Sequence, residues 1–213
     1  MFIVIEGIDG AGCQTQAELI TRKLGNNTSL IKFPHYDTPV GKMIREFLYE
    51  NKKLDARQQF LLYTLQFIFD SEMIRNAAGV TSEKGSRVTE SAVKKKVLVA
   101  DRYFTTTLCY QTLEGFSEEY ALSYAKHFGI IKPDVVFFLD VKPEVAIKWK
   151  YGEEKELNFR EKDLNFMKKT YEKYQDLANR QVWTKWIRIN GEQKIEKVTQ
   201  EIIAKYGENF NHN

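Results

Sequence analysis

After Met1 the chain reads Phe2-Ile3-Val4-Ile5-Glu6-Gly7-Ile8-Asp9-Gly10-Ala11-Gly12-Cys13-Gln14-Thr15-Gln16. The apolar residues predict a short buried strand. The glycines that follow have the spacing of the phosphate-binding pattern G-x-x-x-x-G-K-[ST]. In that pattern the glycines free backbone N–H groups to cradle phosphates, the lysine reaches the β- and γ-phosphates, and the hydroxyl binds Mg²⁺. Gly7 and Gly12 keep the spacing, so we expect a nucleotide-binding loop directly after the first strand.

The loop departs from this pattern at its two chemically active positions. Cys13 stands where the lysine belongs, and Gln14 stands where the hydroxyl belongs. A thiol is a weak donor, a thiolate has the wrong sign, and an amide carries no charge. Thr15 follows at once, and we expect its hydroxyl to serve Mg²⁺ one place later. The loop therefore lacks a cation of its own.

Cys13 has two interpretations. A cysteine at a helix N-terminus tends to have a lowered pKa and to react readily, so oxidation of Cys13 is one hypothesis for blocking the phosphate site. The alternative is a small residue that fills a tight turn. The only other cysteine is Cys109. Two cysteines imply no disulfide framework and suit a reducing cytosol.

The composition is that of an ordinary globular protein. The chain has 213 residues, of which 43% are hydrophobic and 29% charged, and these values allow one large domain with a sizeable core. The net charge of +3 is too small to argue for nucleic acid or a membrane surface. No apolar run approaches membrane-spanning length. We expect a cytoplasmic protein that binds neither nucleic acid nor membranes.

Strand and helix signals alternate along the chain, which predicts an α/β domain with a parallel sheet. Strands are expected at 2–5, 30–33, 97–100, 135–139 and 186–189. Helices are expected at 15–24, 40–49, 57–78 and 195–206, with a helical pair over 143–180. The polar stretch 79–96 is interpreted as a solvated connection. We find no internal repeat and no domain boundary.

Ligands of open α/β sheets bind at the carboxyl ends of the strands. Three segments converge there: the glycine-rich loop, residues 33–36, and Asp101-Arg102-Tyr103. Arg102 is the strongest candidate, because its rigid fork of donors matches phosphate oxygens and stays charged at any working pH. The alternative, a structural ion pair with Asp101, explains its position less well.

These segments, taken in order, resemble one family, the thymidylate kinases. The resemblance rests on residues 6–12, Phe33-Pro34 with 41–48, Asp101-Arg102-Tyr103 with Thr106 and Tyr110-Gln111, and Lys132-Pro133-Asp134 with Leu139-Asp140-Val141. It implies a three-layer P-loop fold, with a parallel sheet flanked by helices, in one domain over residues 1–213. A small helical lid is expected at about 148–162. The implied reaction is phosphoryl transfer from ATP to dTMP with Mg²⁺, giving dTDP and ADP. The family also implies a homodimer.

The resemblance assigns roles only to residues that match. Catalytic roles fall to Asp9, Arg102 and Arg160. ATP and phosphate binding falls to Gly7, Ile8, Asp9, Gly10, Ala11, Gly12, Cys13, Gln14, Thr15 and Gln16. Binding of dTMP falls to Asp9, Tyr36, Phe67, Arg102, Thr107, Tyr110 and Gln111, with Phe67 stacking on the thymine. Metal binding falls to Thr15 and Asp101.

Two departures from the family leave alternatives open. The missing loop lysine calls for another cation, and Arg160 in the lid region is the preferred substitute. Ser71 stands where the family usually has an arginine that meets a thymine carbonyl, and Arg75 lies one turn further on. The alternatives are a kinase for another pyrimidine nucleoside monophosphate, or a catalytically impaired nucleotide-binding paralogue.

Overall fold

The computed structural model describes residues 1–50, 52–79, 96–150, 160 and 163–210. Within them the strands are β1 (Phe2–Glu6), β2 (Thr28–Lys32), β3 (Val97–Asp101), β4 (Val135–Asp140) and β5 (Trp186–Asn190). The helices are α1 (Cys13–Leu24), α2 (Pro39–Tyr49), α3 (Ala56–Phe69), α4 (Ser71–Ala78), α5 (Phe104–Leu113), α6 (Glu118–His127), α7 (Pro143–Lys150), α8 (Leu164–Asn179) and α9 (Ile195–Phe210). The predicted α/β class is confirmed.

The five strands form one parallel sheet in the order β2-β3-β1-β4-β5. The central strand β1 is buried along its whole length, as is expected for a parallel sheet covered on both faces. In the register, Ile5 lies opposite Asp101, and Lys32 at the end of β2 also lies opposite Asp101. The carboxyl ends of β1, β2 and β3 therefore meet at one edge.

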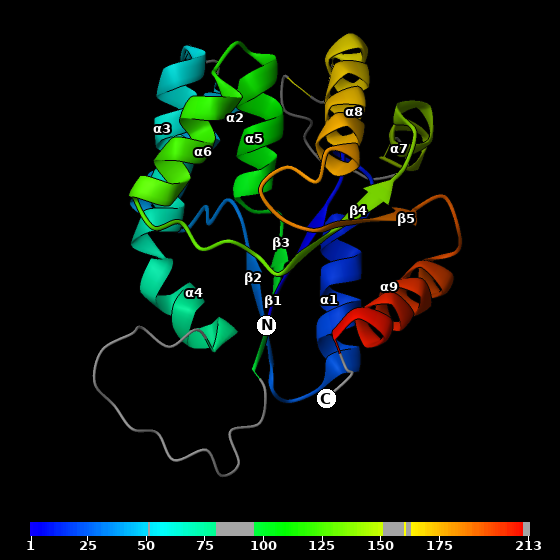
Figure 1. Cartoon of the computed structure of the whole chain (residues 1–213). Coiled ribbons are helices and arrows are strands. Elements are labelled where there is room, and N and C mark those ends of the chain that lie inside the picture. The colour runs from blue at the N-terminus through cyan, green and yellow to red at the C-terminus, as the bar shows by residue number, and fades with distance from the viewer. Residues whose placement is uncertain (51, 80–95, 151–159, 161–162, 211–213) are drawn as a thin grey trace, which may run out of the picture.

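Helices cover both faces of the sheet (Figure 1). α1 and α9 lie on one face, and α4, α5 and α8 lie on the other, with α2 and α3 packed outside α5. Most of the core is one apolar cluster that runs from the strands into these helices. A second, smaller cluster lies between α2 and α3, around Ile44, Phe47 and Leu62.

The expected helix over 57–78 is two helices, which corrects the sequence prediction. Asp70 separates α3 from α4, with φ −87° and ψ 2°. Its carboxylate pairs with His35 at 3.0 Å, so the aspartate has a partner outside the helix. The helical pair over 143–180 is α7 and α8.

Several expectations fall on residues outside the described part. Residues 80–95 of the polar connection expected at 79–96 lie outside it. So do residues 151–159 and 161–162, which make up most of the lid expected at about 148–162. Among the helices that the structure describes, none is long and apolar enough to cross a membrane.

Candidate active site

The glycine-rich loop turns tightly between β1 and α1. The N–H of Ala11 donates to the carbonyl of Ile8 at 3.0 Å, and Gly12 has φ 87° as the residue that precedes α1. This left-handed backbone favours glycine. The first turn of α1 contains no acidic residue, so its backbone N–H groups and the positive end of the helix dipole suit an anion.

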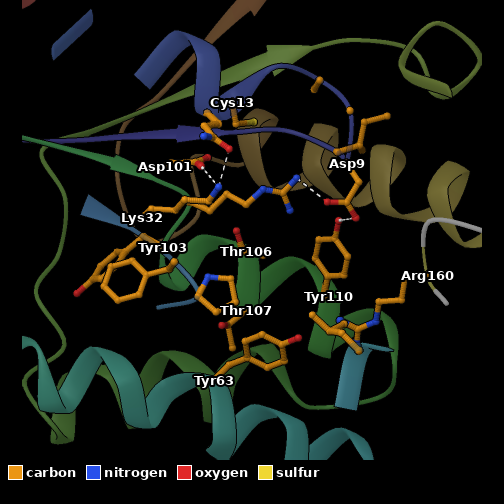
Figure 2. Close-up of a pocket in the computed structure, with 18 of the residues that line it drawn as sticks. Asp9, Cys13, Lys32, Tyr63, Asp101, Tyr103, Thr106, Thr107, Tyr110 and Arg160 are labelled. Atoms are coloured by element: carbon orange, nitrogen blue, oxygen red, sulfur yellow. Dashed lines mark hydrogen bonds and ion pairs between the residues drawn. The ribbon is translucent and has the colours of Figure 1, made fainter. Parts of the chain in front are cut away.

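The loop forms one wall of a cavity of about 460 Å³ at the carboxyl edge of the sheet (Figure 2). This volume is typical of a small-molecule site. The cavity brings together most of the residues selected from the sequence. They are Ile8, Asp9, Gly10, Ala11, Gly12, Cys13, Gln14, Thr15, Tyr36, Phe67, Asp101, Arg102, Thr107, Tyr110, Gln111 and Arg160.

Gly7 and Gln16 are not among the residues that line this cavity, and their assignment to the phosphate site stays a prediction. Gln16 is buried, and its amide nitrogen donates to the carbonyl of Ile195 at 3.1 Å. Its amide oxygen accepts from Thr199 at 2.7 Å. The side chain of Gln16 therefore ties α1 to α9.

Asp9 joins two of the predicted site residues. Its carboxylate pairs with the Arg102 guanidinium at 2.8 Å and accepts from the Tyr110 hydroxyl at 3.1 Å. Burial alone would raise the pKa of Asp9, but Arg102, then Lys150 and Tyr110, hold that pKa below its ordinary value. Asp9 is therefore charged at neutral pH and fixes the direction of the Arg102 side chain.

Arg102 has a strained backbone. Its φ is 65°, a left-handed value that is uncommon outside glycine. The Arg102 N–H donates to the carbonyl of Ile5 at 3.1 Å, which holds this conformation between β3 and α5. Strain of this kind collects at functional sites.

A buried carboxylate that the sequence analysis did not select lies beneath this site. Glu6, at the end of β1, accepts from Thr105 at 2.6 Å, Thr106 at 2.8 Å and Tyr174 at 2.8 Å, and from the Tyr103 N–H at 3.2 Å. Burial raises the pKa of Glu6, although Arg102 and these donors oppose the shift. Glu6 thus joins β1 to α5 and α8. The sequence did contain a signal for Glu6, because this charged residue directly follows the apolar run at residues 2–5.

The wall opposite the loop comes from α3 and α5. Phe67 is only 3% exposed, and its ring packs edge-on against Phe33 and Tyr103. The Gln111 amide donates weakly to Gln59 at 3.4 Å. Tyr63 and Gln66 also line this wall, and sequence reasoning missed both because no motif marks them.

Arg160 lies against this same wall. Its guanidinium pairs with Glu114 at 2.7 Å, bonds to Gln59 and lies over the Tyr110 ring. Figure 2 shows it beside Tyr110. These contacts hold the Arg160 guanidinium on the α3–α5 side of the cavity, where Glu114 balances its charge.

The structure favours the alternative interpretation of Cys13, a small residue that fills a tight turn. The Cys13 side chain is buried, and a Cβ added to Gly7 would lie 3.2 Å from its sulfur, so the thiol packs beneath the loop. Burial raises the pKa of the thiol far above its ordinary value. Cys109 is also buried.

Comparison with known proteins agrees with this geometry. The family model described as thymidylate kinase matches residues 5–202. The chain belongs to the thymidylate kinase family. It is 33% identical over its whole length to a probable thymidylate kinase of Methanocaldococcus jannaschii, covering 98% of that protein. It is 30% identical to the thymidylate kinase of Arabidopsis thaliana over 94% of this chain and 68% of the relative.

Because the chain belongs to the thymidylate kinase family, Ser71 stands where an arginine that contacts the thymine base is expected. Arg75 does not line the cavity, and its guanidinium donates to the carbonyl of Gly129 at 3.4 Å. Gln66, Thr107 and Gln111 are among the neutral polar side chains that α3 and α5 contribute to the cavity lining.

The donor set fits the Mg²⁺ that the thymidylate kinase family implies. The hydroxyl of Thr15 and the carboxylate of Asp101, which is 7% exposed, both line the cavity beside the loop. Among the described residues no group of three or more His, Cys, Asp or Glu side chains could hold a metal alone. Mg²⁺ needs only one or two carboxylates when phosphates and water complete its shell.

Proposed function

We propose that this protein is a thymidylate kinase, which transfers the γ-phosphoryl group of ATP to dTMP and releases dTDP and ADP. Its family membership and its relatives named thymidylate kinase support this reaction. The observation that carries the proposal is the Asp9 carboxylate, which holds Arg102 and Tyr110 in the cavity that the phosphate loop borders.

In this reaction a phosphate oxygen of dTMP attacks the γ-phosphorus of ATP. The bond to the β–γ bridging oxygen breaks, and ADP leaves with the electron pair. Such a transfer depends on positioning and on neutralising phosphate charge. The backbone N–H groups at Gly10 to Gly12 and the N-terminus of α1 suit the β-phosphate. Arg102, oriented by Asp9, binds the phosphate of dTMP.

The nucleoside lies against α3 and α5 in this proposal. Tyr36 and Tyr110 border the deoxyribose, and Phe67 packs on the thymine from its fixed position in the aromatic cluster. Thr107 and Gln111 supply polar contacts to the base. Thr15 and Asp101 would hold Mg²⁺, which neutralises phosphate charge when bound.

We also propose a homodimer. Leu61, Leu65, Phe69 and Met73 recur every four residues along α3 and α4 and are all exposed, whereas Phe60 and Phe67 are in the core. A contiguous apolar stripe of this kind is typical of an interface. Phe69→Glu should give monomers by light scattering, whereas Tyr120→Glu on α6 should not, although both parent side chains are 72% exposed. Retention of the dimer in both variants would exclude this stripe.

Single-domain organisation and a cytoplasmic location complete the proposal. The five strands belong to one sheet, which supports one domain over residues 1–213. Both cysteines are free, which suits the reducing cytoplasm.

The deciding experiment measures ADP release with ATP and Mg²⁺ in the presence of dTMP, dUMP, UMP or CMP. We expect dTMP to give the highest kcat/KM. Preference for another pyrimidine nucleotide would mean that the Ser71 position changes base specificity. Binding of ATP and dTMP without turnover would identify a nucleotide-binding paralogue.

A further inference from the structure

A cation from outside the loop reaches the first turn of α1. The Lys32 ammonium, at the carboxyl end of β2, bonds to the amide oxygen of Gln14 at 2.5 Å. It also lies 3.9 Å from the Asp101 carboxylate. Figure 2 shows Lys32 directed to this end of the cavity, near the label of Cys13. In the phosphate-loop pattern the lysine belongs at position 13. Lys32, 19 positions later in the sequence, places its ammonium beside Gln14, the residue that follows this position.

The fold explains why Lys32 is available there. The parallel register pairs Lys32 with Asp101, and Asp101 with Ile5, so the end of β2 lies on the same edge as the loop. The Lys32 side chain is 49% exposed and lines the cavity, so it is accessible to a ligand in solution.

Gln14 is the second part of this arrangement. Its amide nitrogen donates to Glu18 at 2.9 Å, one turn along α1, while its oxygen accepts from Lys32. The amide is thereby held at both ends. A hydroxyl at this position would be too short to bridge in the same way. The two departures in the loop thus have one explanation, in which the lysine lies elsewhere and Gln14 orients it.

The other basic side chains that line the described cavity are engaged differently. Arg102 pairs with Asp9, and Arg160 pairs with Glu114 on the α3–α5 side. Lys150, at the end of α7, acts electrostatically on Asp9. Lys32 is hydrogen-bonded to Gln14, a residue in the first turn of the phosphate loop's helix.

We propose that Lys32 replaces the missing loop lysine by binding the β- and γ-phosphates of ATP, with Gln14 as its positioning residue. This inference rests on the proposed function and names a phosphate ligand of that site in place of Arg160. The ammonium leaves the weak Asp101 contact for the more highly charged phosphates and neutralises charge that develops during transfer.

The test compares Lys32→Gln with Lys23→Gln, an exposed lysine on α1 that does not line the cavity. Glutamine keeps a hydrogen-bonding side chain at position 32, one bond shorter than lysine, and removes the charge. We expect kcat to fall by about 10²-fold in Lys32→Gln, with unchanged dTMP affinity, and to change by less than about twofold in Lys23→Gln. Lys32→Arg should recover part of the loss.

Gln14→Ala gives the readout for positioning. It should lower kcat/KM for ATP by about tenfold, the size expected for one hydrogen bond to a charged group, and leave the dTMP affinity unchanged. In Lys32→Gln the further change Gln14→Ala should have little effect, because the ammonium it orients is already gone. Additive losses would overturn the positioning role.

Nucleotide binding separates this inference from the proposed function. Lys32→Gln should weaken ADP and ATP binding by calorimetry and leave AMP binding unchanged, whether or not the native protein turns over dTMP. An active native enzyme whose Lys32→Gln variant matches Lys23→Gln would overturn the role of Lys32 and leave the kinase intact. A loss of dTMP affinity instead of ATP affinity would also overturn it.

Discussion

Arg102 and Lys32 are two of the cations that line one cavity, and the protein holds them in opposite ways. Arg102 is 18% exposed, lies on a strained backbone and is paired with a partly buried carboxylate. Lys32 is 49% exposed, and its closest partner is a neutral amide on a neighbouring element. Arg102 is held in position by an ion pair before any ligand binds. Lys32 is a more exposed side chain that is held by a hydrogen bond to Gln14. If Lys32 binds ATP phosphates as proposed, the site supplies positive charge without the loop lysine, but from a less firmly held side chain than Arg102.

The largest effect should come from the fixed side. Arg102→Ala removes a pre-organised phosphate donor, and we expect kcat/KM for dTMP to fall by about 10³-fold. Steady-state kinetics would measure this, with the exposed Arg22→Ala on α1 as control. If Arg102→Ala loses less activity than Lys32→Gln, then the fixed cation contributes less than the exposed one, contrary to our expectation.

Glu6→Ala should remove the buried hydrogen bonds by which Glu6 joins β1 to α5 and α8 beneath Arg102. It leaves the hydroxyls of Thr105 and Tyr174 without their buried acceptor, at a cost of about 3 kcal/mol in the free energy of unfolding. Denaturant unfolding measures the loss, and Glu6→Gln, which keeps an acceptor, should lose less.

The pH dependence of Glu6→Gln sharpens this test. The pKa of Glu6 is raised above its ordinary 4.5, so the native protein loses stability as pH rises from 4.5 through the folded pKa. The variant has no such titration. The free energy of unfolding of Glu6→Gln, relative to that of the native protein, should therefore rise between pH 4.5 and the folded pKa of Glu6. A difference that does not change with pH would contradict this prediction.

Asp9→Asn tests what fixes Arg102. The lowered pKa of Asp9 means that the ion pair contributes stability above the ordinary value of 3.8 and loses it as pH falls below that value. We expect Asp9→Asn to lower the free energy of unfolding by about 2 kcal/mol at pH 7. The difference should shrink as the native carboxylate is protonated, and unfolding curves between neutral and acid pH would follow it.

The smallest effect should come from Cys13→Ala. The thiol is buried and neutral, so the variant should keep kcat within about twofold and change stability by about 1 kcal/mol. Native Cys13 should also resist iodoacetamide until the protein unfolds. Rapid labelling that stops turnover would restore the thiol as a functional group.

The sequence predicted the parts of this site that depend on local pattern. Apolar runs located the strands, and because parallel strands end at one edge, Asp9, Asp101 and Arg102 were expected to meet. The break at Asp70 was not visible in the apolar pattern, and the contact of Asp70 with His35 joins residues 35 positions apart.

Side-chain direction was the other limit. Gln16 follows the loop directly but turns into α9, whereas Lys32 is distant in sequence and turns toward the loop. Arg160 is drawn to Glu114, a residue that no motif includes. These outcomes depend on contacts between elements, which spacing along one chain does not encode.

The left-handed backbone of Arg102 places a conformational cost on the same residue whose side chain pairs with Asp9. A non-glycine residue at such a φ costs about 1–2 kcal/mol, which glycine avoids. Arg102→Gly should therefore melt higher than Arg102→Ala, although both lack the guanidinium and turn over equally poorly. Glycine would relieve the strain but would also leave the Asp9 carboxylate without its ion-pair partner, so removing the strain at position 102 does not by itself give a more stable protein than the native one.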